Sequence, residues 1–434
     1  MQTELRAIAN KAREKKTYRF RNLYTMLNRV NLEDSWRFMN RRAAPGVDGR
    51  TARDYERKLT ANITNLVERL KRKRYRARMV RRVNIPKGRG RLRPLGIPAT
   101  EDKLVQTGVA RILSTIYEQD FVPGSFGYRP NVGPIDAVRG LRRILRFENA
   151  RYVVEADIKG FFDNIDHEWL IRMLRLRVND EAFIRLIQKW LKAGVLDTTG
   201  KVLHPVTGTP QGGVVSPVLA NIYLHHALDL WFERVVKRHC RGEAYIVRYA
   251  DDFVCMFRYK EDAERFYAAL GGRLAKFGLE LAPEKTRIIR FNMFRIEYGA
   301  RFDFLGFEFS WDRNPRGKPM IRLKTARGKF RASLRSLKEW CRENRSLRLR
   351  EFFRRLNAKL RGYYNYYGVI GNYGSLREFH LLAMRLTFRS LNRRSHRRSF
   401  NWRVFNEILV YYRVEQPRIV EKTYGPSQYE FSFR

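Results

Sequence analysis

The chain has 434 residues, 44% of them hydrophobic and 13% aromatic, so it can bury sizeable cores and is not a disordered protein. Its 89 lysines and arginines outnumber the 44 aspartates and glutamates, and the resulting formal charge of +45 requires a polyanionic partner, usually nucleic acid. The three scattered cysteines form no CxxC pair and no apolar run reaches membrane-spanning length, so neither a disulfide framework nor a membrane protein follows, and a cytoplasmic location is expected.

Predicted helices and strands alternate through most of the chain. The stretch up to about residue 40 has helical spacing and precedes the turn APGVDG, and IPKGRGRLRPLGIP at residues 85–98 predicts a strand, a basic glycine turn and a second strand. Apolar residues recur at helical spacing in four later segments, residues 101–119, 167–192, 218–232 and 261–277. A strand is expected at residues 152–162, a hairpin at residues 245–257 and β-rich structure at residues 286–309.

Arginine-rich helical segments dominate after about residue 311. Three helices are expected, at residues 330–343, 350–367 and 376–392, with tyrosine and phenylalanine interleaved among the arginines. A basic cluster, RRSHRRSFNW, begins at residue 393. The order of segments therefore predicts a mixed α/β block, then an all-helical basic block, then a short basic end.

Two adjacent carboxylates interrupt an apolar run in VRYADDFVCM, residues 247–256, and a second apolar strand, VVEADIKGFF, holds Asp157. Burying an unpaired carboxylate is costly, so these acids need a partner. Two-metal nucleotidyl transfer uses carboxylates to hold two divalent ions about 4 Å apart, and aspartate oxygens suit Mg²⁺. An Asp-Asp pair alone is also typical of a surface turn. The second acidic strand and the basic charge of the chain favour the metal interpretation.

Seven ordered blocks around this pair resemble those of reverse transcriptases. YADD resembles their Y-x-D-D box, and APGVDG resembles the extra N-terminal block of group II intron and related non-LTR enzymes. IPKGRGRLRPLGIP is similar to their fingers block, and similar counterparts follow in order: FGYRPNVGPIDAV, ADIKGFFDNIDH, TPQGGVVSPVLANIYLHHALD, GLELAPEKTRI and FLGFEF. The resemblance continues through LRGYYNYYG, and the chain most resembles the reverse transcriptase/maturase encoded by bacterial group II introns.

The resemblance implies an α/β (α+β) right-hand polymerase. Fingers and a palm with an antiparallel sheet are expected at residues 1–310, including an N-terminal extension and block at 1–60. An all-α thumb, or maturase domain, is expected at residues 311–392, and a short basic DNA-binding end at 393–434. That end has no paired cysteines and histidines, so an HNH endonuclease is not expected.

The same resemblance implies a catalytic centre that uses Mg²⁺. Its metal ligands are Asp157, Asp251 and the carbonyl of Ile158, and Asp252 is the second acid of the box. Phe162 matches the bulky residue that packs on the sugar and excludes a 2′-hydroxyl. Its neighbour Phe161 is the residue most easily confused with it, and for both phenylalanines core packing is the alternative.

Further residues are implied in contacts with nucleotide, primer and template. Lys87 and Arg93 flank the basic glycine turn and would neutralise the triphosphate. The incoming nucleotide is also contacted by Gln211. The residues implied along primer and template are Tyr249, Ala250, Gly212, Asn221 and Lys285. For Asn221 the alternative is an amide on a helix surface.

The segment RGYYNYYG resembles the signature of the maturase domain. It implies RNA binding by Arg361, Tyr363, Tyr364 and Tyr366, because arginine with interleaved aromatics suits phosphate contact and base stacking. The alternative is an amphipathic bundle whose aromatics are core, and both can hold if one face packs while the other binds.

The expected function is RNA-directed DNA synthesis by a group II intron-encoded protein that also assists splicing and retrohoming. The expected partners are intron RNA or another structured RNA template, a DNA target and primer, and dNTPs, in a cytoplasmic nucleoprotein particle without membrane contact. Two alternatives remain: a freestanding group II-like enzyme (domesticated, CRISPR-associated, or used in defence or repair) and a non-catalytic splicing maturase. Retention of all three acids argues against the second alternative. The sequence leaves the cognate RNA, the DNA target and the oligomeric state open.

Overall fold

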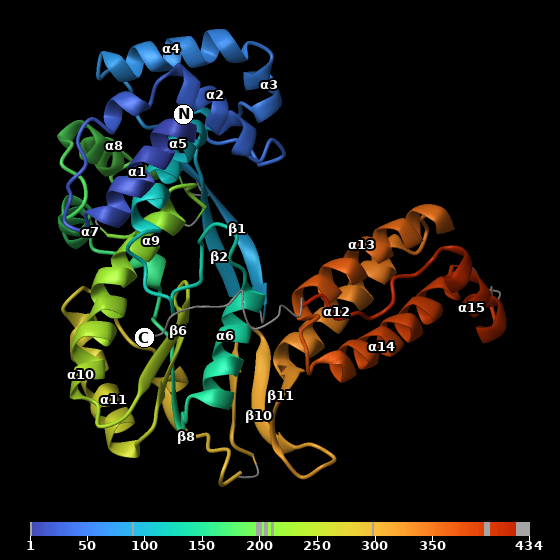
Figure 1. Cartoon of the computed structure of the whole chain (residues 1–434). Helices are drawn as coiled ribbons and strands as arrows, with labels where there is room; N and C mark the ends of the chain where they lie inside the picture. Colours follow the sequence, from blue (N-terminus) through green and yellow to red (C-terminus); the bar gives the residue numbers. More distant parts are fainter. Residues whose placement is uncertain are drawn as a thin grey trace. The chain divides into compact units, whose positions relative to one another are not determined.

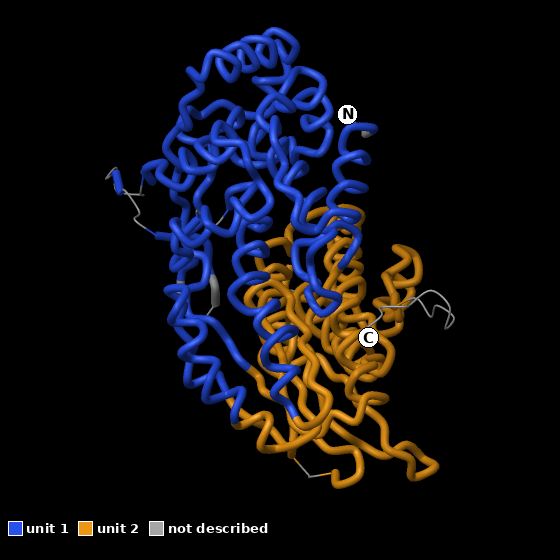
Figure 2. Tube along the Cα trace, turned by 60° about the vertical axis from the view of Figure 1, so that its left-hand side comes forward, with its two compact units in different colours: residues 1–132, 156–240, 265–286 blue, residues 133–155, 241–264, 287–434 orange. Residues whose placement is uncertain are grey.

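The computed structural model describes residues 2–88, 91–196, 202–203, 207–209, 212–296, 299–394 and 400–421. Their backbone forms two units, which are coloured separately in Figure 2. The first unit comprises Met1–Val132, Ala156–Cys240 and Arg265–Thr286, and the second comprises Gly133–Glu155, Arg241–Glu264 and Arg287–Arg434. Each unit is thus assembled from three separate stretches of chain, and each is described by itself below.

The first unit is mainly helical (Figure 1). Its longest helix, α5 (Thr100–Tyr117), is buried almost all round. Side-chain caps fix several starts: Asp166 accepts from the amide of Trp169, and Asp180 from that of Phe183. The remaining helices of this unit are α1 (Gln2–Glu14), α2 (Arg29–Phe38), α3 (Ala52–Glu56), α4 (Leu59–Lys71), α7 (His167–Arg175), α8 (Glu181–Leu191), α9 (Ser216–Leu224) and α10 (Lys237–His239).

A four-stranded sheet completes the first unit, with strand order β2-β1-β4-β5. The strands β1 (Val80–Gly88) and β2 (Arg91–Ile97) form an antiparallel hairpin, which confirms the predicted pair of strands around the basic glycine turn. The two short strands are β4 (Val195–Leu196) and β5 (Val202–Leu203). Helix α9 continues into two π-helical segments, His225–Asp229 and Phe232–Val236.

The second unit contains a four-stranded sheet in the order β6-β7-β3-β8. The strands β6 (Ala244–Tyr249) and β7 (Asp252–Phe257) pair antiparallel, as do β3 (Tyr152–Ala156) and β8 (Arg287–Arg290). Helix α6 (Pro134–Phe147) packs on β6, while α11 (Lys260–Ala275) passes from the second unit into the first. Residues of β6 and β7 are buried on both sheet faces, which explains their continuous apolar sequence.

A second antiparallel sheet in this unit has the order β11-β10-β9. Its strands are β9 (Arg301–Phe304), β10 (Phe307–Arg313) and β11 (Pro319–Thr325). Buried residues alternate with half-buried ones along β10 and with exposed ones along β11, as expected for a sheet with one face in the core. The fingers and palm were expected to end at residue 310, which lies inside strand β10.

Four helices follow in the second unit: α12 (Arg327–Asn344), α13 (Leu349–Tyr367), α14 (Tyr373–Leu391) and α15 (Trp402–Tyr411) (Figure 1). The first three confirm the predicted arginine-rich helices. Phe352, Leu356, Leu360 and Tyr364 recur every fourth residue on α13 and are buried, so this stripe forms its core face. In the described part of the chain, no helix is both long and apolar enough to cross a membrane.

Candidate active site

The acidic pair lies at the tip of the β6–β7 hairpin, in the second unit. Tyr249 is paired with Asp252, so only Ala250 and Asp251 connect the two strands. Ala250 has a φ of +57°, a left-handed conformation that is unfavourable for a residue with a Cβ. Asp252 is exposed and Asp251 half-buried. The hairpin tip therefore keeps both carboxylates out of the apolar strand interior.

A buried arginine stabilises this hairpin tip. Arg248 is fully buried within β6, and its Nη1 donates a 3.0 Å hydrogen bond to the carbonyl of Ala250. This contact holds the left-handed residue whose neighbour is Asp251. Arg248 was not among the residues predicted from the sequence, although an arginine inside a run of apolar residues was the available signal.

The end of α13 lies beside the hairpin within the second unit. Tyr366 donates a 3.1 Å hydrogen bond to the carbonyl of Leu305, and its ring stacks on Phe307 at 6.2 Å. Burial, together with the nearby Tyr367, Tyr249 and Asp252, raises the pKa of Tyr366 to about 12. Tyr366 is 37% exposed, so one edge of its ring is accessible next to the acidic hairpin.

Tyr249 is half-buried and faces an acid on α6. Burial raises the pKa of its hydroxyl, and the carboxylate of Asp136 raises it further. The phenol therefore stays protonated at neutral pH and can donate a hydrogen bond. Asp136 itself accepts from the amide of Gly133, which caps the start of α6.

Asp157 belongs to the first unit, where it directly follows the last residue of β3. Its carboxylate forms an ion pair with Lys285, and its main-chain carbonyl accepts from the amide of Ala282. The carboxylate side chain is one-fifth exposed and Lys285 is 60% exposed, so both remain open to a ligand. Ile158 is buried and bridges Leu281. Lys285, one of the residues expected near the primer, thus contacts Asp157, a candidate catalytic acid.

The adjacent phenylalanines have different surroundings in the first unit. Phe161 is buried and its ring lies 6.4 Å from that of Tyr223. Phe162 is half-buried, and its ring meets Tyr128 edge-on at 6.3 Å. Phe161 is therefore a core residue, whereas Phe162 retains a surface that can touch a ligand.

The glycine-rich loop approaches the β1–β2 hairpin very closely. Gly212 has a φ of +115°, and a Cβ there would come within 2.7 Å of the carbonyl oxygen of Gly96, so no other residue fits. Gln211 lies outside the described residues, as does the side chain of Lys87. Arg93 is exposed on β2.

Asn221 is buried on α9 rather than exposed on a helix surface. Its amide donates a 2.5 Å hydrogen bond to the carbonyl of Gly127, and only 1% of the residue is accessible. The alternative of a surface amide is therefore wrong. The side chain fixes the loop that also carries Tyr128, the ring neighbour of Phe162.

The aromatic residues of RGYYNYYG divide between core and surface. Tyr364 is fully buried and its hydroxyl contacts Nδ1 of His380, while Tyr363 stacks on Phe379 at 3.6 Å. These two rings pack in the bundle, as the core alternative stated. Arg361 is exposed and pairs with Glu415, with 2.6 Å between Nη2 and Oε1. Of the four residues implied in RNA binding, Arg361 and Tyr366 thus have accessible surface.

A basic hollow lies between α12 and α14 in the second unit. One acid, Glu339, and six exposed cations line it: Arg335, Lys338, Arg342, Arg345, Arg389 and Arg393. The four from α12 and its C-terminal cap recur every three or four residues, which places them on one helix face. That spacing is visible in the sequence, but the RNA-binding residues predicted in this domain were those of the aromatic motif.

Within the described ranges, no group of three or more histidine, cysteine, aspartate or glutamate side chains is arranged to hold a metal ion. The donor chemistry of the hairpin nevertheless suits one, because adjacent aspartates offer the hard oxygen ligands that Mg²⁺ prefers. Asp251 and Asp252 belong to one unit and Asp157 to the other.

Comparison with known families decides the class of protein. Residues 85–309 match the family described as reverse transcriptase (RNA-dependent DNA polymerase). The chain belongs to this reverse transcriptase family. Residues 330–407 match the group II intron, maturase-specific domain. The chain is therefore a reverse transcriptase with a group II intron maturase domain, which confirms the resemblance and the expected fold class, a right-hand polymerase type with antiparallel sheets and a helical C-terminal region.

Curated relatives of this reverse transcriptase include intron-encoded proteins. It is 45% identical over 164 residues to the group II intron-encoded protein LtrA of Lactococcus lactis subsp. cremoris, which covers 38% of this chain and 27% of LtrA. It is 33% identical to Protein YkfC of Escherichia coli over 57% of this chain and 73% of that protein. It is 29% identical to the putative COX1/OXI3 intron 1 protein of Saccharomyces cerevisiae over 70% and 45% of the two chains.

The matched parts span about a quarter of LtrA and less than half of the yeast protein. Among solved structures, the telomerase of Candida albicans with a fragment of telomeric RNA is 14% identical, with a TM-score of 0.45 over 80% of this chain and 67% of that chain. The apo telomerase of Candida tropicalis is 15% identical, with a TM-score of 0.44 over 77% and 61%.

Proposed function

We propose that this reverse transcriptase is an active RNA-directed DNA polymerase, encoded by a group II intron, that also binds its intron RNA as a maturase and supports retrohoming. The observation that carries the proposal is the hairpin tip with Asp251 and Asp252. Its strained Ala250 is held by the buried Arg248, and strained backbone that the surrounding structure maintains is typical of functional sites.

The proposed catalytic acids are Asp157, Asp251 and Asp252. Mg²⁺ would be held by Asp157, Asp251 and the carbonyl of Ile158, where bound divalent ions lower the pKa of the primer hydroxyl and neutralise charge on the transferring phosphate. The ion pair with Lys285 orients the carboxylate of Asp157, which supports its role as a ligand.

The first unit supplies the proposed contacts for the nucleotide. Arg93 is exposed on the β1–β2 hairpin and would neutralise the triphosphate together with Lys87, and Gln211 would contact the base pair. Phe162 would pack on the sugar and exclude a 2′-hydroxyl. The absence of a side chain at Gly212 lets the glycine-rich loop lie against β2, which supports a role beside the template.

The helical part of the second unit supplies the proposed surface for structured RNA. Six cations around one hollow between α12 and α14 suit a phosphate backbone, and Arg361 and the exposed edge of Tyr366 extend the same type of chemistry. Because Tyr363 and Tyr364 are buried, we assign them to packing of this surface rather than to stacking on bases.

The decisive experiment is primer extension on an RNA template with the purified full-length chain and Mg²⁺, wild type beside Asp251→Asn. Wild type is expected to make cDNA, and the variant to lose activity by about a hundredfold or more, as when a charged group in a catalytic site is removed. Asp312→Asn is the matched control, because Asp312 is an exposed aspartate paired with Arg322. If wild type makes no cDNA, or if Asp251→Asn extends as well as the control, the assignment fails.

A further inference from the structure

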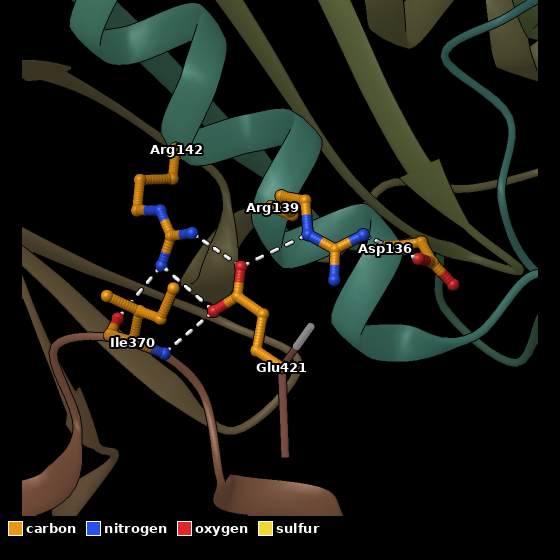
Figure 3. Close-up of polar contacts among 5 residues, drawn as sticks. All are labelled: Asp136, Arg139, Arg142, Ile370 and Glu421. Atoms are coloured by element: carbon orange, nitrogen blue, oxygen red, sulfur yellow. Dashed lines mark hydrogen bonds and ion pairs between the residues drawn. The ribbon is translucent and has the colours of Figure 1, made fainter. Parts of the chain in front are cut away.

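Glu421 is a buried carboxylate that the proposed polymerase chemistry does not use. Its side chain is 2% exposed and contacts two arginines of α6 (Figure 3). Oε1 accepts from Arg139 Nε at 3.1 Å and from Arg142 Nη2 at 2.5 Å, while Oε2 accepts from Arg142 Nη1 at 3.2 Å. Two guanidinium groups thus converge on one carboxylate, and all three residues belong to the second unit.

The same carboxylate also holds the turn between α13 and α14. Its Oε2 accepts from the amide of Ile370 at 2.7 Å, and the carbonyl of Ile370 accepts from Arg142 at 2.8 Å (Figure 3). The amides of Val420 and Glu421 both donate to the carbonyl of Gly368, at 2.8 and 3.0 Å. Helix α6, the turn and the segment ending at Glu421 are therefore joined by one network.

The chain packs closely around Gly368 in this network. A Cβ on Gly368 would lie 2.7 Å from the carbonyl oxygen of Arg418 and would collide with that of Tyr364. A buried carboxylate with four polar contacts is well satisfied, but removing its charge leaves two part-buried guanidinium groups facing each other. The network should therefore loosen as a whole when Glu421 loses its charge.

Helix α6 connects this network to the acidic hairpin. Arg139 pairs with Asp136, with 3.2 Å between Nη1 and Oδ1, and Asp136 is the acid that faces Tyr249 of β6. The body of α6 packs on both β6 and β11. A shift of α6 would therefore reach the strand that ends next to Ala250 and Asp251.

We propose that Glu421 is a positioning residue. Together with Arg139 and Arg142 it attaches the turn between α13 and α14 to α6. This attachment keeps α13 and α14 correctly placed relative to the hairpin that carries Asp251 and Asp252. The inference rests on the proposed polymerase function, because this placement matters if the helices hold a template–primer that the hairpin extends. Glu421, Arg139 and Arg142 themselves take no part in the chemistry.

The test is steady-state single-nucleotide extension and a processivity assay with full-length Glu421→Gln. The KM for template–primer is expected to rise about tenfold, and products per binding event to shorten several-fold, while kcat at saturating template–primer stays within about twofold. Glu407→Gln is the matched control: Glu407 lies on α15, 66% exposed and 3.6 Å from Arg403, and should behave as wild type.

A second variant tests the proposal even if Glu421→Gln does not fold. Arg142→Lys keeps the positive charge but replaces the two-pronged contact with one, so it should raise the same KM by about threefold. If Glu421→Gln does not fold, unchanged KM in Arg142→Lys overturns the proposal. An unchanged KM in a folded Glu421→Gln, or a fall in kcat alone, also overturns it. Absence of cDNA from wild type would instead reject the polymerase function, so the two failures are distinguishable.

Discussion

At the residue scale, the two neighbouring phenylalanines show how burial separates side chains that look alike in sequence. Phe161 lies in the core and Phe162 retains accessible surface next to Tyr128. The loop that carries Tyr128 is in turn fixed by Asn221. A ring in such a position can contact a bound nucleotide, whereas a ring in the core can only support the fold.

We expect Phe162→Ala to relax discrimination against ribonucleotides, because a smaller side chain no longer excludes the 2′-hydroxyl. The ratio of kcat/KM for a dNTP to that for the matching rNTP should fall by about tenfold or more. Phe161→Ala is the control, since it should lower the free energy of unfolding by about 3–5 kcal/mol without altering that ratio. Equal ratios in wild type and Phe162→Ala would remove Phe162 from the gate.

The residue types of the candidate site were predictable from the sequence, but the contacts that hold each side chain in place were not. The hairpin tip followed from the apolar runs on both sides of the acids. The left-handed Ala250 and the supporting Arg248 depend on backbone geometry and on burial, which one sequence does not reveal. For the same reason Tyr364 could be selected as an RNA contact although it is fully buried.

At the element scale, α5 begins with an acid that the helix buries. Asp102 is 3% exposed; its carboxylate accepts from the hydroxyl of Tyr75 and from the amide of Arg78 at 3.1 Å. Burial raises the pKa of Asp102 to about 6, although both hydrogen bonds act to lower it. The folded state therefore binds a proton more tightly than the unfolded chain does.

This raised pKa predicts how stability changes with pH. Protonated Asp102 contributes to the free energy of unfolding. This contribution is complete below about pH 4, near the pKa of Asp102 in the unfolded chain, and is lost as the pH rises through about 6. From pH 4 to 7, the free energy of unfolding of wild type should fall relative to Asp102→Asn by on the order of 2–3 kcal/mol. Urea unfolding across this range measures the difference, with Asp312→Asn as control for loss of a surface carboxylate. Parallel curves for wild type and Asp102→Asn would contradict the prediction.

Most helices could be predicted because their apolar spacing is strong, as in α5 and α13. The strand β11 could not, because arginine and lysine alternate with its buried residues and the segment resembles the basic block that follows. Its partner β10 was therefore expected to end too early. Pairing with a neighbouring strand, rather than local composition, determines this element.

At the scale of the whole molecule, the charge of +45 is the dominant property. The basic hollow between α12 and α14 concentrates part of it on one surface. Each phosphate contact releases condensed counterions, so the affinity for RNA should fall steeply as salt is added. This property was predictable from composition, but the location of the surface was not.

Salt titration of RNA binding tests this surface. Replacing Arg335 and Arg342 together with glutamine should reduce the slope of log K against log salt by roughly one to two. The matched control replaces Arg29 and Arg37, which are already paired with Glu33 and Asp34, and should change the slope less. An unchanged slope in the Arg335 and Arg342 variant would exclude the hollow as a main RNA contact.

The network around Glu421 also bears on when the chain can finish folding. Arg139 precedes Glu421 by 282 residues, so at about 5–20 residues per second a ribosome releases the arginine roughly 15–55 s before the glutamate. All three stretches of the first unit are complete once the ribosome has added Thr286. The arginines of α6, by contrast, gain their partner only when Glu421 has been added. The first unit can thus mature on the nascent chain, whereas the second completes its packing only after Glu421 has been synthesised.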